Sequence, residues 1–199
     1  MHVFRNHIRN KLLLLLFFAL SVILITVFWG FSSMKGVMSD YSDEVNQEAI
    51  IMSEVAELNV KFKTQVQEWK NTLIRGNDPE QLDKYWGRFN QTAEWIQKHY
   101  TYLLQTINDD HPAQQHIQKF AKSYPDMLAA YRTGYDTYIM SNKNITVADH
   151  SVKGIDRAPT ENLNLAVEAV NKSILELRAK TEKKAQFELL FTEINTLIT

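Results

Sequence analysis

The chain contains no cysteine among its 199 residues. This absence excludes disulfide frameworks, thiolate metal sites and cysteine nucleophiles. Glycine and proline are also scarce, with six and four residues respectively. A β-sandwich or barrel needs many turns, whereas these breakers gather at a few points of the chain. The composition therefore predicts long, uninterrupted helices.

A basic surplus is also missing, since 22 Lys and Arg stand against 23 Asp and Glu. Binding of nucleic acid is therefore not expected. Acidic residues are absent before Asp40, whereas Arg5, Arg9 and Lys11 lie within the first eleven positions. The N-terminus is thus basic, and the rest of the chain is acidic.

A charge-free stretch runs from Leu12 to Phe31. Its length of about 20 residues matches a helix that crosses the bilayer. Phe28, Trp29 and Phe31 close the stretch where a cleaved signal peptide would carry small residues. We therefore expect an uncleaved transmembrane signal anchor at residues 12–32. A core helix is the alternative, but so long a charge-free run is rare in a soluble domain of this size.

The charges on either side of this span predict its orientation. Three cations precede it, and Asp40, Asp43 and Glu44 follow it. The positive-inside rule then makes residues 1–11 a cytoplasmic tail and exports residues 33–199 to the periplasm of a bacterium. In this chain the inner (cell) membrane would be crossed once.

Four stretches with apolar residues three and four positions apart follow the span. Breakers separate them at Gly76 to Pro79, at Asn108 to Pro112, and over Ser141 to Pro159. The last helix is expected from about Thr160 onward. The fold class is therefore all-α, with an N-terminal transmembrane helix followed by an up-down-up-down four-helix bundle. Pro125 predicts a kink in the third helix or its division into two pieces.

The C-terminus ends without a cap, glycine or polar tail. We therefore expect the chain to be a fragment, or a form truncated before a second transmembrane helix. Six aromatic residues could be imagined as a stacking platform, but most fall on the apolar stripes, so core packing is the preferred interpretation. They are Trp69, Trp86, Trp95, Tyr131, Tyr135 and Tyr138.

Two segments carry a family resemblance. The run from Phe62 to Gly76 reads F-x-x-Q-V-Q-E-W-K-N-x-L-x-R-G, and Lys84-Tyr85-Trp86 and Phe89 follow it. Before the last helix stands Val152 to Thr160, V-K-G-I-D-R-x-P-T. Both resemble segments of methyl-accepting chemotaxis proteins, and the resemblance covers nearly the whole chain.

This resemblance implies a homodimer whose periplasmic bundle binds small solutes and moves the membrane helices. In that family the signal passes through a HAMP linker to a methylated cytoplasmic coiled coil, and this sequence contains neither. The function expected is the ligand-sensing input module of a bacterial chemoreceptor. Two alternatives stay open: the same module on a histidine kinase or diguanylate cyclase, and a structural membrane-anchored bundle without a ligand.

Catalytic residues are not recognisable, and neither an enzyme activity nor a cofactor is expected. Asp109, Asp110, His111 and His116 form the only local group of acids and imidazoles. The two histidines are five residues apart and flank a turn, whereas a metal site typically has histidines at i and i+4 on one helix face. A solvated loop is therefore preferred over a metal site.

The candidate ligand-binding residues follow from helical geometry. At 100° per residue, Asn59, Lys63 and Lys70 line one edge of the first helix's apolar stripe. Their cationic and amide donors suit the carboxylate of a small organic or amino acid. Ordinary solvated lysines are the plainer alternative.

Three further cations are ranked behind these residues as ligand-binding candidates. Arg75 is expected on another side of the first helix, complementing its C-terminal dipole. The next candidates for binding the ligand are in the loop before the last helix, at Lys153 and Arg157.

Overall fold

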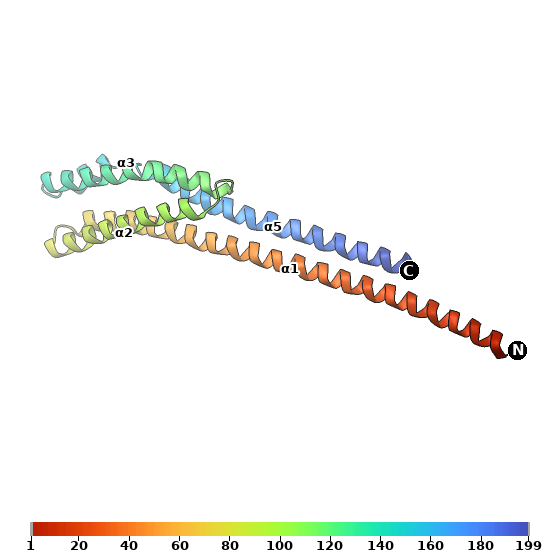
Figure 1. The fold of residues 1–199 in the computed structure, drawn as a ribbon. Coiled ribbons are helices and arrows are strands. Elements are labelled where there is room, and N and C mark those ends of the chain that lie inside the picture. Colours follow the sequence, from red (N-terminus) through yellow and green to blue (C-terminus); the bar gives the residue numbers. More distant parts are fainter. Residues whose placement is uncertain (1, 199) are drawn as a thin grey trace. The chain divides into compact units, whose positions relative to one another are not determined.

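The computed structural model describes residues 2–198, and all of its regular structure there is helical. The helices are α1 His2–Arg75, α2 Pro79–Thr106, α3 Pro112–Met140, α4 Ile145–Ser151 and α5 Arg157–Ile198 (Figure 1). The prediction of an all-α fold is confirmed. The first helix is continuous to Arg75, as its pattern predicted.

The chain divides into two units. The core unit is Glu48–Ile174, and it contains the end of α1, all of α2, α3 and α4, and the start of α5. The terminal unit consists of Met1–Gln47 and Leu175–Thr199.

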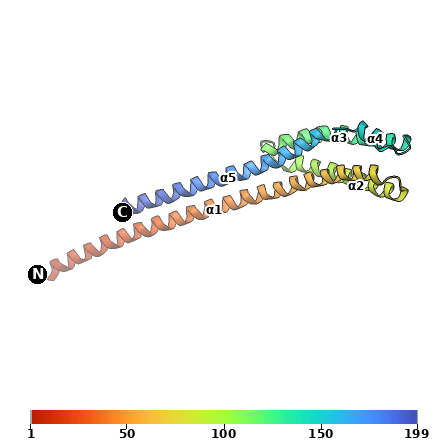
Figure 2. The ribbon, with the colours of Figure 1, turned by 180° about the vertical axis from the view of Figure 1, so that it is seen from behind.

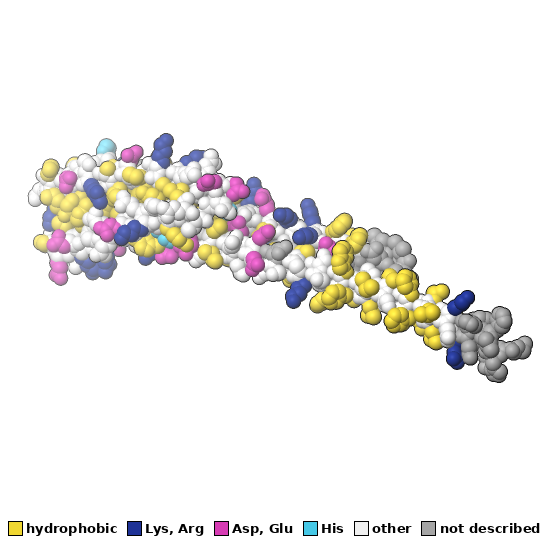
Figure 3. Space-filling view, in the orientation of Figure 1, with side chains coloured by type: hydrophobic (Ala, Val, Ile, Leu, Met, Phe, Trp, Pro, Cys, Tyr) yellow, Lys and Arg dark blue, Asp and Glu magenta, His cyan; other side chains and the backbone are white. Residues whose placement is uncertain are grey.

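The terminal unit contains the stretch suited to a membrane. In α1 an 18-residue window has a mean hydropathy of 2.9, and none of it is buried, unlike a core helix of a soluble protein. Figure 3 shows hydrophobic side chains gathered along this part of α1. By length and composition, α1 is the one helix among the described residues that could cross a membrane.

The helices of the core unit lie side by side (Figures 1 and 2). Aromatic side chains make up much of the buried core between them. Phe62 of α1 meets Phe120 of α3 edge to face, with ring centroids 5.5 Å apart. Trp69 of α1 lies 5.2 Å from Tyr131 of α3 by the same measure. Such pairs contribute about 0.5–1.5 kcal/mol beyond the burial of their area. Trp69, Tyr131 and Tyr138 are buried and Trp86, Trp95 and Tyr135 partly buried against the same core, which confirms the packing interpretation.

Local capping explains where α2 begins. The carboxylate of Asp78 accepts hydrogen bonds from the backbone N–H groups of Glu80 and Gln81, and Pro79 occupies the first turn. An N-cap acid followed by proline satisfies or removes donors that a helix start leaves free.

Two sequence predictions about the helices are corrected. The alternative of two separate helices at Pro125 is wrong, because α3 runs through this residue. The stretch from Ser141 to Pro159 is also not all loop, since it contains α4, which packs against α3 (Figure 2). The side chain of Asn144 caps α4 by accepting from the Val147 N–H at 3.2 Å. A helix of seven residues is too short to show a reliable apolar period in the sequence. The last helix also begins earlier than the expected Thr160, at Arg157, because proline is tolerated in the first turn of a helix.

Candidate functional site

Asn59 joins the predicted ligand edge of α1 to α5. Its Nδ2 donates to Oδ1 of Asn164 at 3.3 Å. The other amide atom of Asn59, Oδ1, is buried and has no hydrogen-bond partner. An unpaired buried acceptor is costly, so this oxygen weakens the seam between α1 and α5.

The two helices run antiparallel along this seam. Asn59 bonds to Asn164, and eleven residues earlier on α1 Glu48 bonds to Ser173, nine residues later on α5. Counting about 1.5 Å per residue from the asparagine pair places Lys63 near the level of Thr160. Lys63 and Lys70 are exposed, so their ammonium groups are open to solvent. Lys70 is seven residues beyond Lys63. The same count places Lys70 near the level of the α4–α5 connection.

A shallow groove of about 530 Å³ follows the start of α5. Its lining carries one guanidinium, from Arg157, and three carboxylates, from Asp156, Glu161 and Glu168. Asn164 also lines it, and its hydrogen bond to Asn59 connects the groove to the α1 edge. The remaining lining residues are Thr160 and Leu165. Lys153, the other candidate in this region, is exposed and lies outside the groove lining.

Arg75 belongs to a different face. Its guanidinium carbon lies 5.6 Å from the centre of the Tyr85 ring on α2. Lys84 and Arg88 approach the same ring at 5.4 and 5.9 Å. Arg88 also lies 4.0 Å from a carboxylate oxygen of Glu68. The structure thus separates Arg75 from the other candidates and places it in an α1/α2 cation cluster that sequence reasoning missed, although Lys84 and Arg88 flank Tyr85 along the chain.

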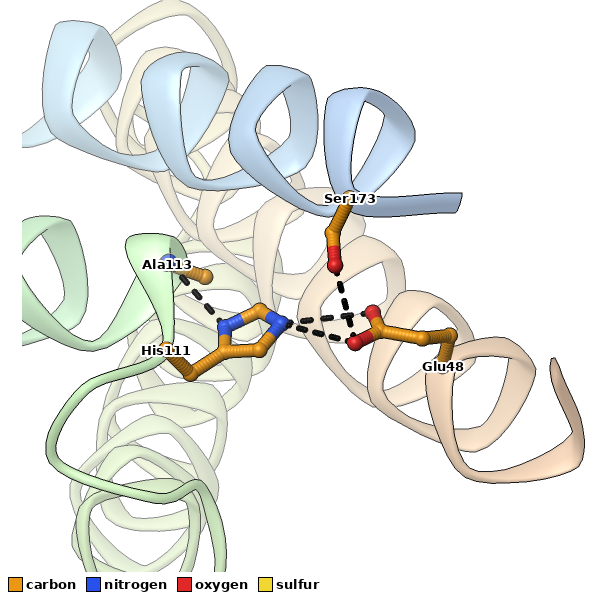
Figure 4. Close-up of polar contacts among 4 residues, drawn as sticks. All are labelled: Glu48, His111, Ala113 and Ser173. Carbon is orange, nitrogen blue, oxygen red and sulfur yellow. Dashed lines mark hydrogen bonds and ion pairs between the residues drawn. The ribbon is translucent and has the colours of Figure 1, made fainter. Parts of the chain in front are cut away.

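A second polar site lies around Glu48 of α1 (Figure 4). The Nε2 of His111 lies 3.2 Å from each of its carboxylate oxygens, and the hydroxyl of Ser173 donates to Oε1 at 2.9 Å. The His111 side chain is 10% exposed and that of Glu48 is 15% exposed. The expectation of a solvated loop is therefore wrong at His111, because the imidazole reaches inward to another helix.

The acids and imidazoles of the core unit do not converge on a metal. Among the described residues no group of three His, Cys, Asp or Glu is placed to hold one. His116 has a different environment from His111: burial lowers the pKa of its imidazole, and its Nδ1 is buried without a partner. His99 of α2 pairs with Glu54 of α1 at 3.3 Å.

Sequence reasoning could not have found Glu48 and Ser173. They are 125 residues apart, and His111 lies 63 residues from Glu48. Each of the three residues is of a type that ordinarily lies on a solvated helix face or turn. Only the packing of α1, α3 and α5 brings them together.

Comparison with known proteins supports one relationship. The chain is 27% identical over 156 residues to the methyl-accepting chemotaxis protein CtpH of Pseudomonas aeruginosa. The match covers 78% of this chain but 27% of that protein, so the chain spans about a quarter of the relative's length. No protein-family model matches the chain, and no solved structure matches it.

Proposed function

We propose that this chain is the ligand-sensing input module of a bacterial transmembrane chemoreceptor. The observation that carries the proposal is the similarity to a methyl-accepting chemotaxis protein over 78% of the chain. The exposed apolar stretch of α1 and the all-helical core unit agree with a membrane-anchored signalling protein. The similarity favours chemotaxis over a kinase or cyclase output.

In this proposal the long helices form an up-down-up-down bundle outside the cell. Residues 12–32 are the anchor, residues 1–11 lie in the cytoplasm, and residues 33–199 form the periplasmic sensor domain of a protein in the inner membrane. The three leading cations and the acids after the span support this orientation.

The ligand site proposed is the α1/α5 seam. Asn59, Lys63 and Lys70 supply an amide and two ammonium groups, and Arg157 adds a guanidinium from the groove on α5. The groove also carries three carboxylates. Cations and acids along one seam suit a small solute that carries a carboxylate and also an amino group.

Thermal unfolding of the full chain in lipid nanodiscs tests this site. The chain would be screened against amino acids and small organic acids. A ligand at 100 times its Kd should stabilise the fold by about 2.7 kcal/mol. Lys70→Glu and Arg157→Glu should abolish the shift, because each reverses a charge that faces the carboxylate.

Lys122→Glu is the matched control, since it reverses an exposed lysine on α3. It should leave the shift intact. A ligand that still stabilises folded Lys70→Glu and Arg157→Glu rules out the seam. Signalling is tested separately by fusing the chain to the second membrane helix and cytoplasmic part of a chemoreceptor. A stabilising ligand should then change kinase activity in cells, and no change would argue against the sensor function.

We also propose a homodimer that forms through α1. On the outward face of α1, uncharged residues three or four positions apart form a stripe within the core unit. They are Val60, Thr64, Gln67, Asn71 and Ile74. Val60 and Ile74 are 62% and 65% exposed. An uncharged helical stripe with exposed aliphatics suits a second copy of itself across a two-fold axis.

A further inference from the structure

The carboxylate of Glu48 is the meeting point of three helices. It accepts from the imidazole of His111 at the start of α3 and from the hydroxyl of Ser173 on α5 (Figure 4). Glu48 and Ile174 are the first and last residues of the core unit, and Ser173 directly precedes Ile174. The contact therefore lies at the end of the core unit where α1 enters it and α5 leaves it.

His111 has a second partner that determines its tautomer. It is the N-cap of α3, and its Nδ1 accepts from the backbone N–H of Ala113 at 3.1 Å. A backbone N–H can only donate, so Nδ1 must carry a lone pair. The proton of the neutral ring is then on Nε2, where it faces Glu48.

A proton added to this ring therefore has a specific consequence. The imidazolium carries hydrogen on both nitrogens, so Nδ1 can no longer cap α3. Its Nε2–H now makes a charge-assisted bond to Glu48, which is shorter and stronger than the neutral bond. The first turn of α3 loses its cap while the ring is drawn toward α1.

The surroundings of His111 contain acids on two elements. Glu48 faces it from α1, and Asp109 and Asp110 precede it in the α2–α3 connection. Asp109 accepts from Gln114 of α3 at 3.4 Å. The last turn of α2 has no basic residue. On α5, Lys172 directly precedes Ser173.

We propose that the proton is a second stimulus for this protein, bound at Nδ1 of His111. Binding exchanges the α3 cap for an ion pair with Glu48 and so changes the spacing of α1 and α3 at this end of the core unit. Histidine is the side chain whose charge changes most readily near physiological pH, which suits it to a proton stimulus. The role as a stimulus rests on the proposed export of the core unit, but the exchange itself does not.

One nuclear magnetic resonance signal reports the exchange directly. Pro112-Ala113 is the only Pro-Ala pair in the sequence. Labelling proline carbonyl carbons with ¹³C and alanine nitrogens with ¹⁵N therefore selects the Ala113 amide of the full chain in nanodiscs. This amide proton should shift upfield with falling pH, at the same midpoint as the ¹⁵N signals of the His111 ring. An Ala113 amide that stays constant while the ring titrates overturns the proposal.

Substitutions separate His111 from other groups. His111→Asn keeps a cap that does not titrate, so the pH response of Ala113 should be lost. His111→Ser, with a cap of another shape, should give the same loss. His99→Asn removes the other imidazole–carboxylate pair and should leave the response intact. A response that persists in folded His111→Asn or His111→Ser contradicts the proposal.

The spacing is measured between spin labels, which the absence of native cysteine allows. Ser53→Cys on α1 and Gln118→Cys on α3 are both exposed positions. The distance distribution should differ between pH 5 and pH 8 in the parent chain and in His99→Asn. In His111→Asn the distance distribution should be the same at pH 5 and pH 8. An unchanged distance in the parent chain would sink the coupling between the proton and helix spacing.

Discussion

The hydroxyl of Tyr124 on α3 donates to Oε1 of Gln65 on α1 at 2.9 Å, and both side chains are fully buried. The Nε2 of Gln65 is directed at the backbone carbonyl of Phe89 on α2, 3.5 Å away. One amide thus connects three helices inside an aromatic core. A polar group in such a place stabilises the fold only while its partners are present.

Tyr124→Phe should therefore destabilise the core unit. The ring remains, but the buried Oε1 of Gln65 loses its donor, at a cost of about 1–3 kcal/mol. Urea unfolding of the full chain in nanodiscs, followed by circular dichroism, measures the loss. Tyr102→Phe is the control, since Tyr102 is 46% exposed and its change should stay within about 0.5 kcal/mol. Equal losses in the two variants would mean that the buried bond contributes nothing.

Two glycines within helices should respond to alanine in opposite directions. A Cβ on Gly134 would lie 2.7 Å from Cγ1 of Val152 and 3.2 Å from Trp69, so Gly134→Ala should cost about 1–3 kcal/mol by overpacking. A Cβ on Gly87 would meet nothing within 4 Å. Gly87→Ala should then stabilise α2 by roughly 0.5–1 kcal/mol, because alanine loses less conformational entropy on folding. If both variants shifted the unfolding midpoint in the same direction from that of the parent chain, this account of Gly134 would be refuted.

Alkaline pH should unfold the core unit through its tyrosines. Burial raises the pKa of Tyr124 and of Tyr131, and the carboxylates of Asp156 and Asp149 raise that of Tyr131 further. In the unfolded chain the pKa of these phenols is about 10. The folded chain holds the proton more tightly, so the stability is fully present below that pH and is lost as pH rises through the raised folded values.

Absorbance at 295 nm and circular dichroism, recorded together, follow this transition. Ionisation of the Tyr124 and Tyr131 phenols should coincide with the loss of helix. Tyr131→Phe should remove one tyrosine from the late absorbance step. Full ionisation of all eight tyrosines with the helices intact would disprove the prediction.

The proposed topology predicts the behaviour of reporter fusions. Alkaline phosphatase joined after Gly76 should be active, because it folds only outside the cytoplasm. A reporter that works only in the cytoplasm, joined at the same residue, should be silent. The reverse pattern would exclude an exported sensor domain.

The proposed dimer predicts disulfide formation along the outer face of α1. Gln67→Cys, introduced into the cysteine-free chain in membranes, should give a cross-linked dimer under mild oxidation. Gln118→Cys on α3 is also exposed and should give much less. Equal cross-linking at both positions would point to random collision.

Residues close together in the sequence allowed much of this protein to be predicted. The charge-free stretch after the basic N-terminus determined the candidate span, and the apolar spacing determined the long helices. Asp78 and Pro79 marked the start of α2, because capping depends on neighbours along the chain. These features act over a few residues, so they can be read without knowing what packs against them.

The tertiary structure decided which polar groups meet. It joined Asn59 to Asn164, placed Arg75 over the Tyr85 ring, and brought His111 to Glu48 and Ser173. It also located α4 in a stretch predicted as loop. None of these contacts leaves a local pattern, because a polar side chain on a helix looks the same in sequence whether it faces water or another helix. Its partner is determined by the crossing and register of helices that aromatic packing holds together.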